Sequence, residues 1–254
     1  MKFKSIKIEG WKQFGEIDIT FDPRITILTG ANGSGKTTIL NILARHLGWY
    51  SMELSTPIKD EESGIIRFLQ NLFGTREVRN KIGKIAYDDG KTTDLLITES
   101  NAAQVEIQFS SQNSVEGVNI PSHRPHFTYQ AVSQLSVKKR EKQQAFQLVK
   151  DSNHQRLSGG GNGKTVNYFI KETLITWGVY GFGNEKIVSD KEQVDFYNGF
   201  EEVLRKMLPQ SIGFKEFSIL NGEIVLKTKS GDFIIDAVSG GLSAIIDLSW
   251  QIYM

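Results

Sequence analysis

A glycine-rich stretch near the start of the chain reads Gly30-Ala31-Asn32-Gly33-Ser34-Gly35-Lys36-Thr37. It fits the pattern G-x-x-x-x-G-K-[ST] at each fixed position. Apolar residues alternate with polar ones before it, so residues 24–29 are predicted to form a strand. Apolar residues recur at helical spacing after it, so a helix is predicted to follow. This order of strand, loop and helix argues against a chance glycine-rich turn.

The residue types in this loop suit the binding of phosphate groups. Glycines let the backbone curl so that its N–H groups point at phosphate oxygens, and the following helix adds the positive end of its dipole. Lys36 can reach the β- and γ-phosphates, and the Thr37 hydroxyl can ligate Mg²⁺. We therefore expect ATP and Mg²⁺ as cofactors. The predicted nucleotide-binding residues are Gly30, Ala31, Asn32, Gly33, Ser34, Gly35, Lys36, Thr37 and Thr38.

Composition excludes several classes of protein. The 254 residues include 30 Lys and Arg, 29 Asp and Glu and no Cys, and the net charge is +1. A nucleic-acid surface would therefore have to be a local patch, and disulfides, thiolate zinc sites and cysteine nucleophiles are excluded. No apolar run approaches the roughly 18–20 residues of a membrane span, and the N-terminus lacks the apolar core of a signal peptide. We expect a cytoplasmic protein with no membrane partner.

The first half of the chain is predicted to hold most of the strands of an α/β protein. Residues 1–50 contain strands, the glycine loop and the first helix. Residues 51–136 contain further strands, including a hairpin with its turn at Asp88-Asp89-Gly90. Within this second part, apolar spacing predicts a short helix over residues 65–73, and residues 117–120 are predicted to form a strand that ends at a proline.

The second half is predicted to be mainly helical. Residues 137–213 read as helices, with a flexible glycine-rich loop near residues 157–165. Residues 214–254 begin with a hairpin whose turn is Asn221-Gly222, a strong signal for a type I′ turn. A further strand, a Ser-Gly-Gly turn and an apolar helix complete this part.

Two stretches of the N-terminal part form a wider pattern. One reads Lys7-Ile8-Glu9-Gly10-Trp11-Lys12-Gln13-Phe14, and the other runs from Ile27 to Leu40 through the loop. Together they resemble the ABC-type ATPases of the SMC/RecF branch, and most of all the RecF-like, defence-associated ATPases of prokaryotes. The resemblance covers residues 1–50 and 214–254. It implies a P-loop NTPase fold of ABC-ATPase type, with a mixed β-sheet core, a helical insert (lid) between P-loop and signature, and Lys12 beside the nucleotide.

A second family element lies near the C-terminal end of the sequence. The stretch Asp236-Ala237-Val238-Ser239-Gly240-Gly241-Leu242-Ser243 resembles the ABC signature, with Val for Leu and Leu for Gln. The resemblance implies that Ser239, Gly240 and Gly241 bind the γ-phosphate held by an opposite subunit. The alternative is a helix cap, because Ser is a favoured N-cap residue. Leu157-Ser158-Gly159-Gly160 also matches, but its flanks are polar.

The Q-loop of this family should ligate Mg²⁺ and orient water. No Gln ends a strand in the expected region, so the candidates are His123 and Gln130. The alternative for this region is a polar surface loop.

Hydrolysing members of the family also need an apolar strand that ends in Asp-Glu. No such run occurs in the 254 residues. We therefore interpret the sequence as the N-terminal portion of a longer ATPase, with its catalytic carboxylates unidentified. Residues 1–254 alone are expected to be inactive in hydrolysis.

The resemblance implies a switch in which two heads sandwich ATP, as a homodimer or a higher oligomer. Such heads act on DNA or on an effector protein such as a nuclease, in DNA repair or antiviral defence. A basic cluster could contact DNA or be only a solvated face; it consists of Lys138, Lys139, Arg140 and Lys142. The alternatives are a P-loop small-molecule kinase and the nucleotide-binding subunit of a transporter.

Overall fold

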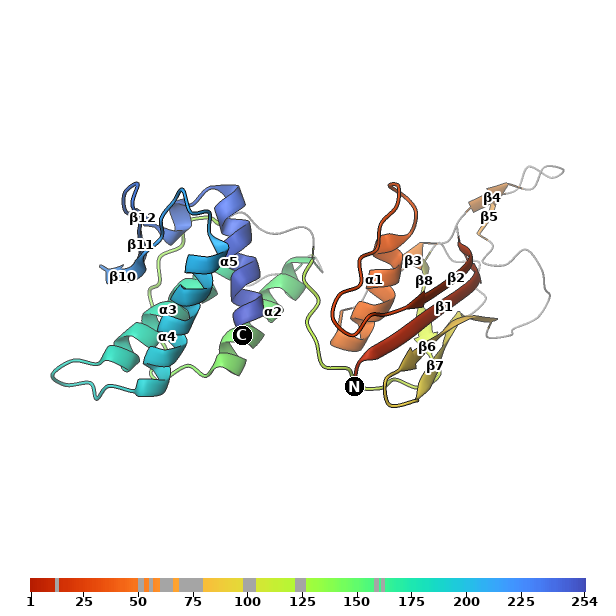
Figure 1. Cartoon of the computed structure of the whole chain (residues 1–254), viewed down its shortest axis with the longest axis horizontal. Helices are drawn as coiled ribbons and strands as arrows, with labels where there is room; N and C mark the ends of the chain where they lie inside the picture. Colours follow the sequence, from red (N-terminus) through yellow and green to blue (C-terminus); the bar gives the residue numbers. More distant parts are fainter. Residues whose placement is uncertain are drawn as a thin grey trace. The chain divides into compact units, whose positions relative to one another are not determined.

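The structure is a computed structural model that describes residues 1–11, 14–49, 53–54, 57–59, 66–68, 80–97, 104–121, 127–157, 160 and 163–254 (Figure 1). The chain divides into two compact units, Met1–Asn119 and Ile120–Met254. Each unit has its own hydrophobic core. The glycine loop belongs to the first unit and the signature-like turn to the second, and each unit is described by itself.

The first unit is built on an antiparallel sheet of five strands in the order β2-β1-β6-β7-β9. Alternating apolar residues place Ile6 of β1 opposite Ile19 of β2 and Ile85 of β6. The strands of this sheet are β1 Phe3–Trp11, β2 Phe14–Thr20, β6 Asn80–Tyr87, β7 Thr92–Ile97 and β9 Ile107–Phe109. Two smaller pairs are β3 Glu53–Leu54 with β8 Gln104–Val105, and β4 Pro57–Lys59 with β5 Ile66–Phe68.

Helix α1, Lys36–Ala44, packs against this sheet and continues into a short 3-10 turn, η1, Arg45–Leu47 (Figure 1). Ile39 and Ile42 of α1 lie in one buried cluster with residues of β1 and β7. Strand β6 comes so close to β1 at Gly83 that an added Cβ atom would lie 2.1 Å from the Lys7 carbonyl oxygen. Only glycine fits there, and the close approach helps to fix the sheet that supports α1.

The second unit is built around α3, Val166–Phe182, which is buried over most of its length. Helix α2, Lys142–Leu157, and helix α4, Lys191–Met207, pack against α3, and α5, Gly240–Tyr253, packs against α4 (Figure 1). Trp177 of α3 stacks on Trp250 of α5 with ring centroids 5.5 Å apart. The remaining elements are β10 Glu216–Leu220, β11 Glu223–Lys227, β12 Phe233–Ile234 and the 3-10 turn η2 Ile235–Ala237.

Local sequence accounts for several boundaries in this unit. The Asp190 carboxylate caps α4 by accepting hydrogen bonds from the backbone N–H groups of Glu192 and Gln193. Asn221 and Gly222 have φ values of 50° and 77°, as the turn between β10 and β11 requires. The predicted Asn-Gly hairpin is therefore confirmed, and so is the hairpin that turns at residues 88–90.

Residues 24–29 do not form the predicted strand. The Asp22 carboxylate accepts hydrogen bonds from the N–H groups of Arg24 and Ile25, which gives the backbone local partners in place of a strand ladder. Ile25 and Ile27 are 69% and 77% exposed. Within the described residues, no strand pairs with this segment.

Two other predicted elements also differ. Residues 66–68, inside the predicted helix over 65–73, form strand β5, because they pair with β4; the rest of that segment lies outside the described residues. Residues 117–120 are irregular rather than a strand, since they begin with glycine and run into Pro121, which cannot donate to a ladder.

The α/β class is confirmed, but every described strand pair is antiparallel, whereas a mixed sheet was expected. The segment expected to supply the central strand, residues 24–29, is unpaired among the described residues. Helices α2 to α4 fall within the predicted helical insert, and their action as a lid stays a prediction. No described helix has the length and apolar character needed to cross a membrane.

Candidate nucleotide-binding site

The loop between residue 29 and α1 owes its curled path to three glycines. Gly30, Gly33 and Gly35 have φ values of 149°, 82° and 91°, in the region that other residues rarely adopt. A Cβ atom on Gly30 would lie 2.9 Å from the Ser34 hydroxyl oxygen. The backbone therefore turns back on itself because glycine stands at these positions, of which Gly30 and Gly35 are the two fixed glycines of the motif.

Lys36 folds back over this loop. Its ammonium donates hydrogen bonds to the carbonyl oxygens of Gly30 and Ala31, both at 2.8 Å, and approaches the Ser34 hydroxyl at 3.4 Å. The positive charge is thus held over the loop by weak, neutral acceptors. Phosphate oxygens are stronger partners for an ammonium, so an anion in the loop would compete well for it.

The first turn of α1 suits an anion as well. Gly35 stands at the N-cap, where it has no side chain to cap the helix, and the first turn carries no acidic residue. The free N–H groups and the positive end of the helix dipole therefore face no protein anion in this turn. Thr37 is exposed in the same turn, and Thr38 is half-buried. These features fit a bound triphosphate, with Thr37 available as a hydroxyl ligand for Mg²⁺.

The signature-like turn occupies the start of α5. Ser239 is the N-cap residue, yet its side chain makes no capping hydrogen bond. Ser239, Gly240 and Gly241 are exposed, and the first turn of α5 holds no acidic residue. The helix starts with a hydrogen bond of 2.9 Å from the Ser243 N–H to the Ser239 carbonyl oxygen. Because the Ser239 side chain makes no capping hydrogen bond, the helix-cap alternative does not account for the choice of serine at this N-cap position.

Comparison with known proteins agrees with the P-loop geometry. A family model described as an AAA domain matches residues 5–228, most of the chain. The chain belongs to this family. It is also 24% identical over 183 residues to the DNA replication and repair protein RecF of Pseudomonas putida (strain W619). The match covers 71% of this chain and 39% of that protein, so the chain spans well under half the length of this relative. Together the two findings support the resemblance to the SMC/RecF-like ABC ATPases.

Several predicted site residues cannot be placed in this AAA-domain chain. Lys12 and His123 lie outside the described residues, as does Ser158 of the competing match that was set aside. Gln130, the other Q-loop candidate, uses its side-chain amide within the second unit. Its Oε1 accepts from the Thr165 N–H at 2.9 Å, and its Nε2 donates to the Gly163 carbonyl oxygen. In this arrangement Gln130 holds the chain ahead of α3, and its Q-loop role stays a prediction.

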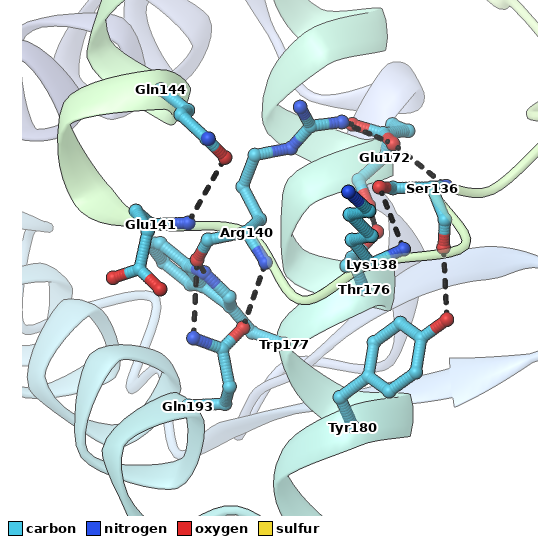
Figure 2. A network of polar contacts seen from close by, with 10 residues as sticks. All are labelled: Ser136, Lys138, Arg140, Glu141, Gln144, Glu172, Thr176, Trp177, Tyr180 and Gln193. Atoms are coloured by element: carbon cyan, nitrogen blue, oxygen red, sulfur yellow. Dashed lines mark hydrogen bonds and ion pairs between the residues drawn. The ribbon is translucent and has the colours of Figure 1, made fainter.

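The basic cluster is not a free patch. Arg140 donates from one nitrogen, Nη2, to both carboxylate oxygens of Glu172, at 2.8 and 3.0 Å (Figure 2). Lys139 pairs with Asp190 at 3.2 Å. Lys142 donates to the Tyr253 carbonyl oxygen and lies 3.5 Å from the centre of that ring, and burial lowers the pKa of its ammonium. Of the four basic residues, only the exposed Lys138 has no hydrogen bond or ion pair described for its ammonium. The cluster therefore gives little support to DNA contact.

Sequence reasoning missed a buried polar cluster beneath the signature-like turn. Asp236 accepts hydrogen bonds from Asn167 and Lys171 of α3, and Lys171 also pairs with Glu223 at 2.9 Å. A signal was present, since Asn167 and Lys171 stand four residues apart in a helix that is otherwise apolar on that side. Polar residues in a buried helix face need partners, but the sequence did not show which ones.

Proposed function

We propose that this chain is an ATP-binding head that pairs with a second head around ATP and works as a switch. The observation that carries the proposal is the glycine loop with Lys36 folded over it and an uncapped, acid-free helix start behind it. Residues 30–38 would hold the triphosphate, with Lys36 on its terminal phosphates and Thr37 on Mg²⁺. Bound Mg²⁺ would neutralise part of the phosphate charge.

The pairing of two heads is supported by the second site. An exposed serine, two glycine N–H groups and a helix start without acidic residues would form an anion site at Ser239, Gly240 and Gly241. In an arrangement like that of the ABC ATPases, this turn would meet the γ-phosphate held by the loop of the other head. ATP binding would then close the pair, and loss of the γ-phosphate would open it.

The molecule on which the switch acts is proposed from the similarity to RecF. The relative in Pseudomonas putida is named a DNA replication and repair protein, which favours DNA as the target and DNA repair as the setting. The alternative target is an effector protein such as a nuclease, and the setting would then be antiviral defence. A P-loop kinase would bind ATP through the same loop, but it would not require a second copy of the chain.

Sedimentation velocity with and without Mg²⁺-ATP tests the pairing. The wild-type chain should sediment as a monomer without nucleotide and as a dimer with it. Lys36→Ala and Ser239→Arg should each stay monomeric, because each removes one side of the composite site. A mixture of the two variants should regain dimer, since one intact loop can then face one intact turn.

Two exposed positions provide matched controls for these substitutions: Lys138→Ala for the loss of a lysine and Gln210→Arg for the gain of an arginine. Both should dimerise like the wild type. If calorimetry shows that the wild-type chain binds ATP but the chain remains a monomer, the pairing is refuted and the P-loop kinase alternative is favoured.

A further inference from the structure

Asp236 is a buried carboxylate three residues ahead of Ser239. Its side chain is 1% exposed. Oδ1 accepts a hydrogen bond of 2.6 Å from the Asn167 side-chain amide, and Oδ2 accepts one from the Lys171 ammonium. Asn167 and Lys171 lie one turn apart on α3, so one helix holds both oxygens of a single carboxylate.

Lys171 is the centre of this cluster. Its side chain is fully buried, and besides Asp236 it contacts Glu223 at the start of β11. Its ammonium also lies 5.1 Å from the centre of the Tyr129 ring. Burial alone would lower the pKa of Lys171, but the hydrogen bonds and charges of the two carboxylates outweigh burial and raise it. A charged lysine therefore joins α3, β11 and the η2 turn that contains Asp236.

The cluster extends to the segment around Gln130. The Asn167 amide also donates to the Thr128 carbonyl oxygen at 2.7 Å, and its own oxygen accepts from the Thr165 hydroxyl. Thr165 in turn is held by Gln130. The donors that hold Asp236 are therefore fixed by their own partners, which leaves the carboxylate little freedom to move.

The signature-like turn has few contacts of its own to hold it. Ser239, Gly240 and Gly241 are exposed, and Ser239 makes no capping bond. On the N-terminal side, the chain enters the turn from Ile235, which is fully buried, and from Asp236. On the C-terminal side, the buried Ser243 closes the first helical hydrogen bond. The position of the turn therefore depends on the residues on either side of it.

We propose that Lys171 and Asn167 are positioning residues that act through Asp236 to set the path of the signature-like turn. This inference rests on the proposed function, because that function gives the turn its ligand, the terminal phosphate of ATP. The alternative is that the buried cluster only adds to the stability of the second unit. A neighbouring ion pair in the same helix separates these two roles.

Glu172 follows Lys171 in α3 and forms a separate, largely buried ion pair in this unit. It accepts from Arg140, and the two side chains are 7% and 18% exposed. Figure 2 shows this pair with Ser136, Trp177 and Gln193, which hold residues 136–141 against α3 and α4. None of the hydrogen bonds and ion pairs described for this pair reaches residues 236–243. Replacing the pair should therefore weaken the unit without moving the turn.

The experiment compares two paired apolar replacements in the full 254-residue chain, Lys171→Met/Asp236→Leu and Arg140→Met/Glu172→Leu. Apolar replacement of both partners removes both charges of each pair. Glu223, which loses Lys171 in the first variant, is 18% exposed and can be hydrated. The main readout is hydrogen exchange of the Ser243 amide without nucleotide, measured at temperatures equally far below each melting point. We expect exchange about tenfold faster in the first variant and within about twofold of wild type in the second.

Asp236→Asn is a milder variant in case the first pair does not fold. Asparagine has an NH2 group in place of one carboxylate oxygen, so one of the two donors, Asn167 or Lys171, would face another donor. We expect faster Ser243 exchange here too, together with a weaker Mg²⁺-ATP-dependent dimer, whereas the Arg140→Met/Glu172→Leu variant should dimerise like the wild type. Equal Ser243 exchange in all the variants and the wild type would refute the positioning role. A wild-type chain that never dimerises would instead refute the proposed function, because the exchange measurement does not depend on nucleotide.

Discussion

At the scale of single residues, Lys36 gives the most direct prediction. Lys36→Ala removes an ammonium whose partners, among the described residues, are two carbonyl groups and a hydroxyl of its own loop. Hydrogen bonds to charged groups contribute about 1.5–3 kcal/mol each, so ATP affinity should fall by roughly 10–100-fold. Isothermal titration calorimetry measures this change, with Lys138→Ala as the control. Unchanged affinity would remove Lys36 from the site.

His46 gives a prediction about pH. Its Nε2 lies 2.7 Å from the Tyr87 hydroxyl, and its ring packs against Phe3 and Phe109. Burial, with a smaller effect of the Arg45 charge, lowers the pKa of His46 below its ordinary value of 6.5. The unfolded chain therefore takes up a proton at a higher pH than the folded chain does. Stability from this residue is complete above about pH 6.5 and is lost as the pH falls towards the folded pKa.

This loss should appear in urea unfolding between pH 7.5 and 5, with a slope of at most about 1.4 kcal/mol per pH unit. His46→Phe keeps an aromatic ring but cannot titrate, so it should flatten that part of the profile. The variant will be less stable than wild type at neutral pH, because the Tyr87 hydroxyl loses one of its hydrogen-bond partners. A pH profile with the same slope in both chains would contradict the assignment of a neutral, buried His46.

The residues that the sequence predicted well are those whose chemistry is local. The glycine loop was predictable because the positive φ values of Gly30, Gly33 and Gly35 are needed within six residues. The Arg140–Glu172 and Lys171–Asp236 pairs were not predictable, because their partners stand 32 and 65 residues apart in the sequence. From the sequence alone the basic cluster looks like an exposed patch of positive charge. In the fold, Lys139 pairs with Asp190 and Arg140 with Glu172.

At the scale of elements, the same distinction separates the hairpins from the strand before the loop. The Asn221-Gly222 turn carries its own conformational signal, and β10 and β11 pair as the sequence predicts. Residues 24–29 have a strand-like pattern, but a strand also needs a neighbour for its backbone groups. Whether such a neighbouring strand is present depends on how the whole sheet assembles. The alternation of Ile25 and Ile27 carries no information about that.

The segment of residues 136–141 gives a prediction about stability. Arg140→Met would leave the Glu172 carboxylate buried with only the Ser136 N–H, at 3.3 Å, to compensate its charge. Removing one partner of a buried ion pair costs about 3–5 kcal/mol, and the remaining N–H places this case near the lower value. Urea unfolding should show a loss of about 3 kcal/mol that changes little with salt, because buried pairs are weakly screened.

Lys138→Ala is the control for this loss. It removes a neighbouring positive charge that is exposed, so it should change stability by less than about 0.5 kcal/mol. If Arg140→Met were as mild as the control, the segment would be held by its backbone contacts and the aromatic residues rather than by the ion pair.

At the scale of the whole molecule, the two motifs stand on separate cores. The P-loop is supported by the sheet and α1 of the first unit, and the signature-like turn by α3, β11 and η2 of the second. The AAA-domain match crosses both units, so one family accounts for the two cores together. Each motif can therefore be disabled by a substitution in its own unit, which is what makes the mixing experiment with Lys36→Ala and Ser239→Arg informative.

The last prediction is that residues 1–254 bind ATP but do not turn it over. Phosphoryl transfer needs a positioned group to orient the attacking water, and a phosphate cradle alone does not supply one. The sequence that comes nearest to an apolar strand ending in acidic residues is Phe233-Ile234-Ile235-Asp236. Its Asp236 is buried, with both carboxylate oxygens held by Asn167 and Lys171, so it is not available to water or Mg²⁺.

Phosphate release from the purified chain should therefore equal that of Lys36→Ala, under conditions in which calorimetry shows that only the wild type is saturated with ATP. Turnover clearly above that control would show that a catalytic carboxylate lies within these residues. Asp236→Asn, tested at a chain concentration at which it still dimerises with Mg²⁺-ATP, would then identify it: loss of the turnover there would assign the role to Asp236 and contradict its purely positional function.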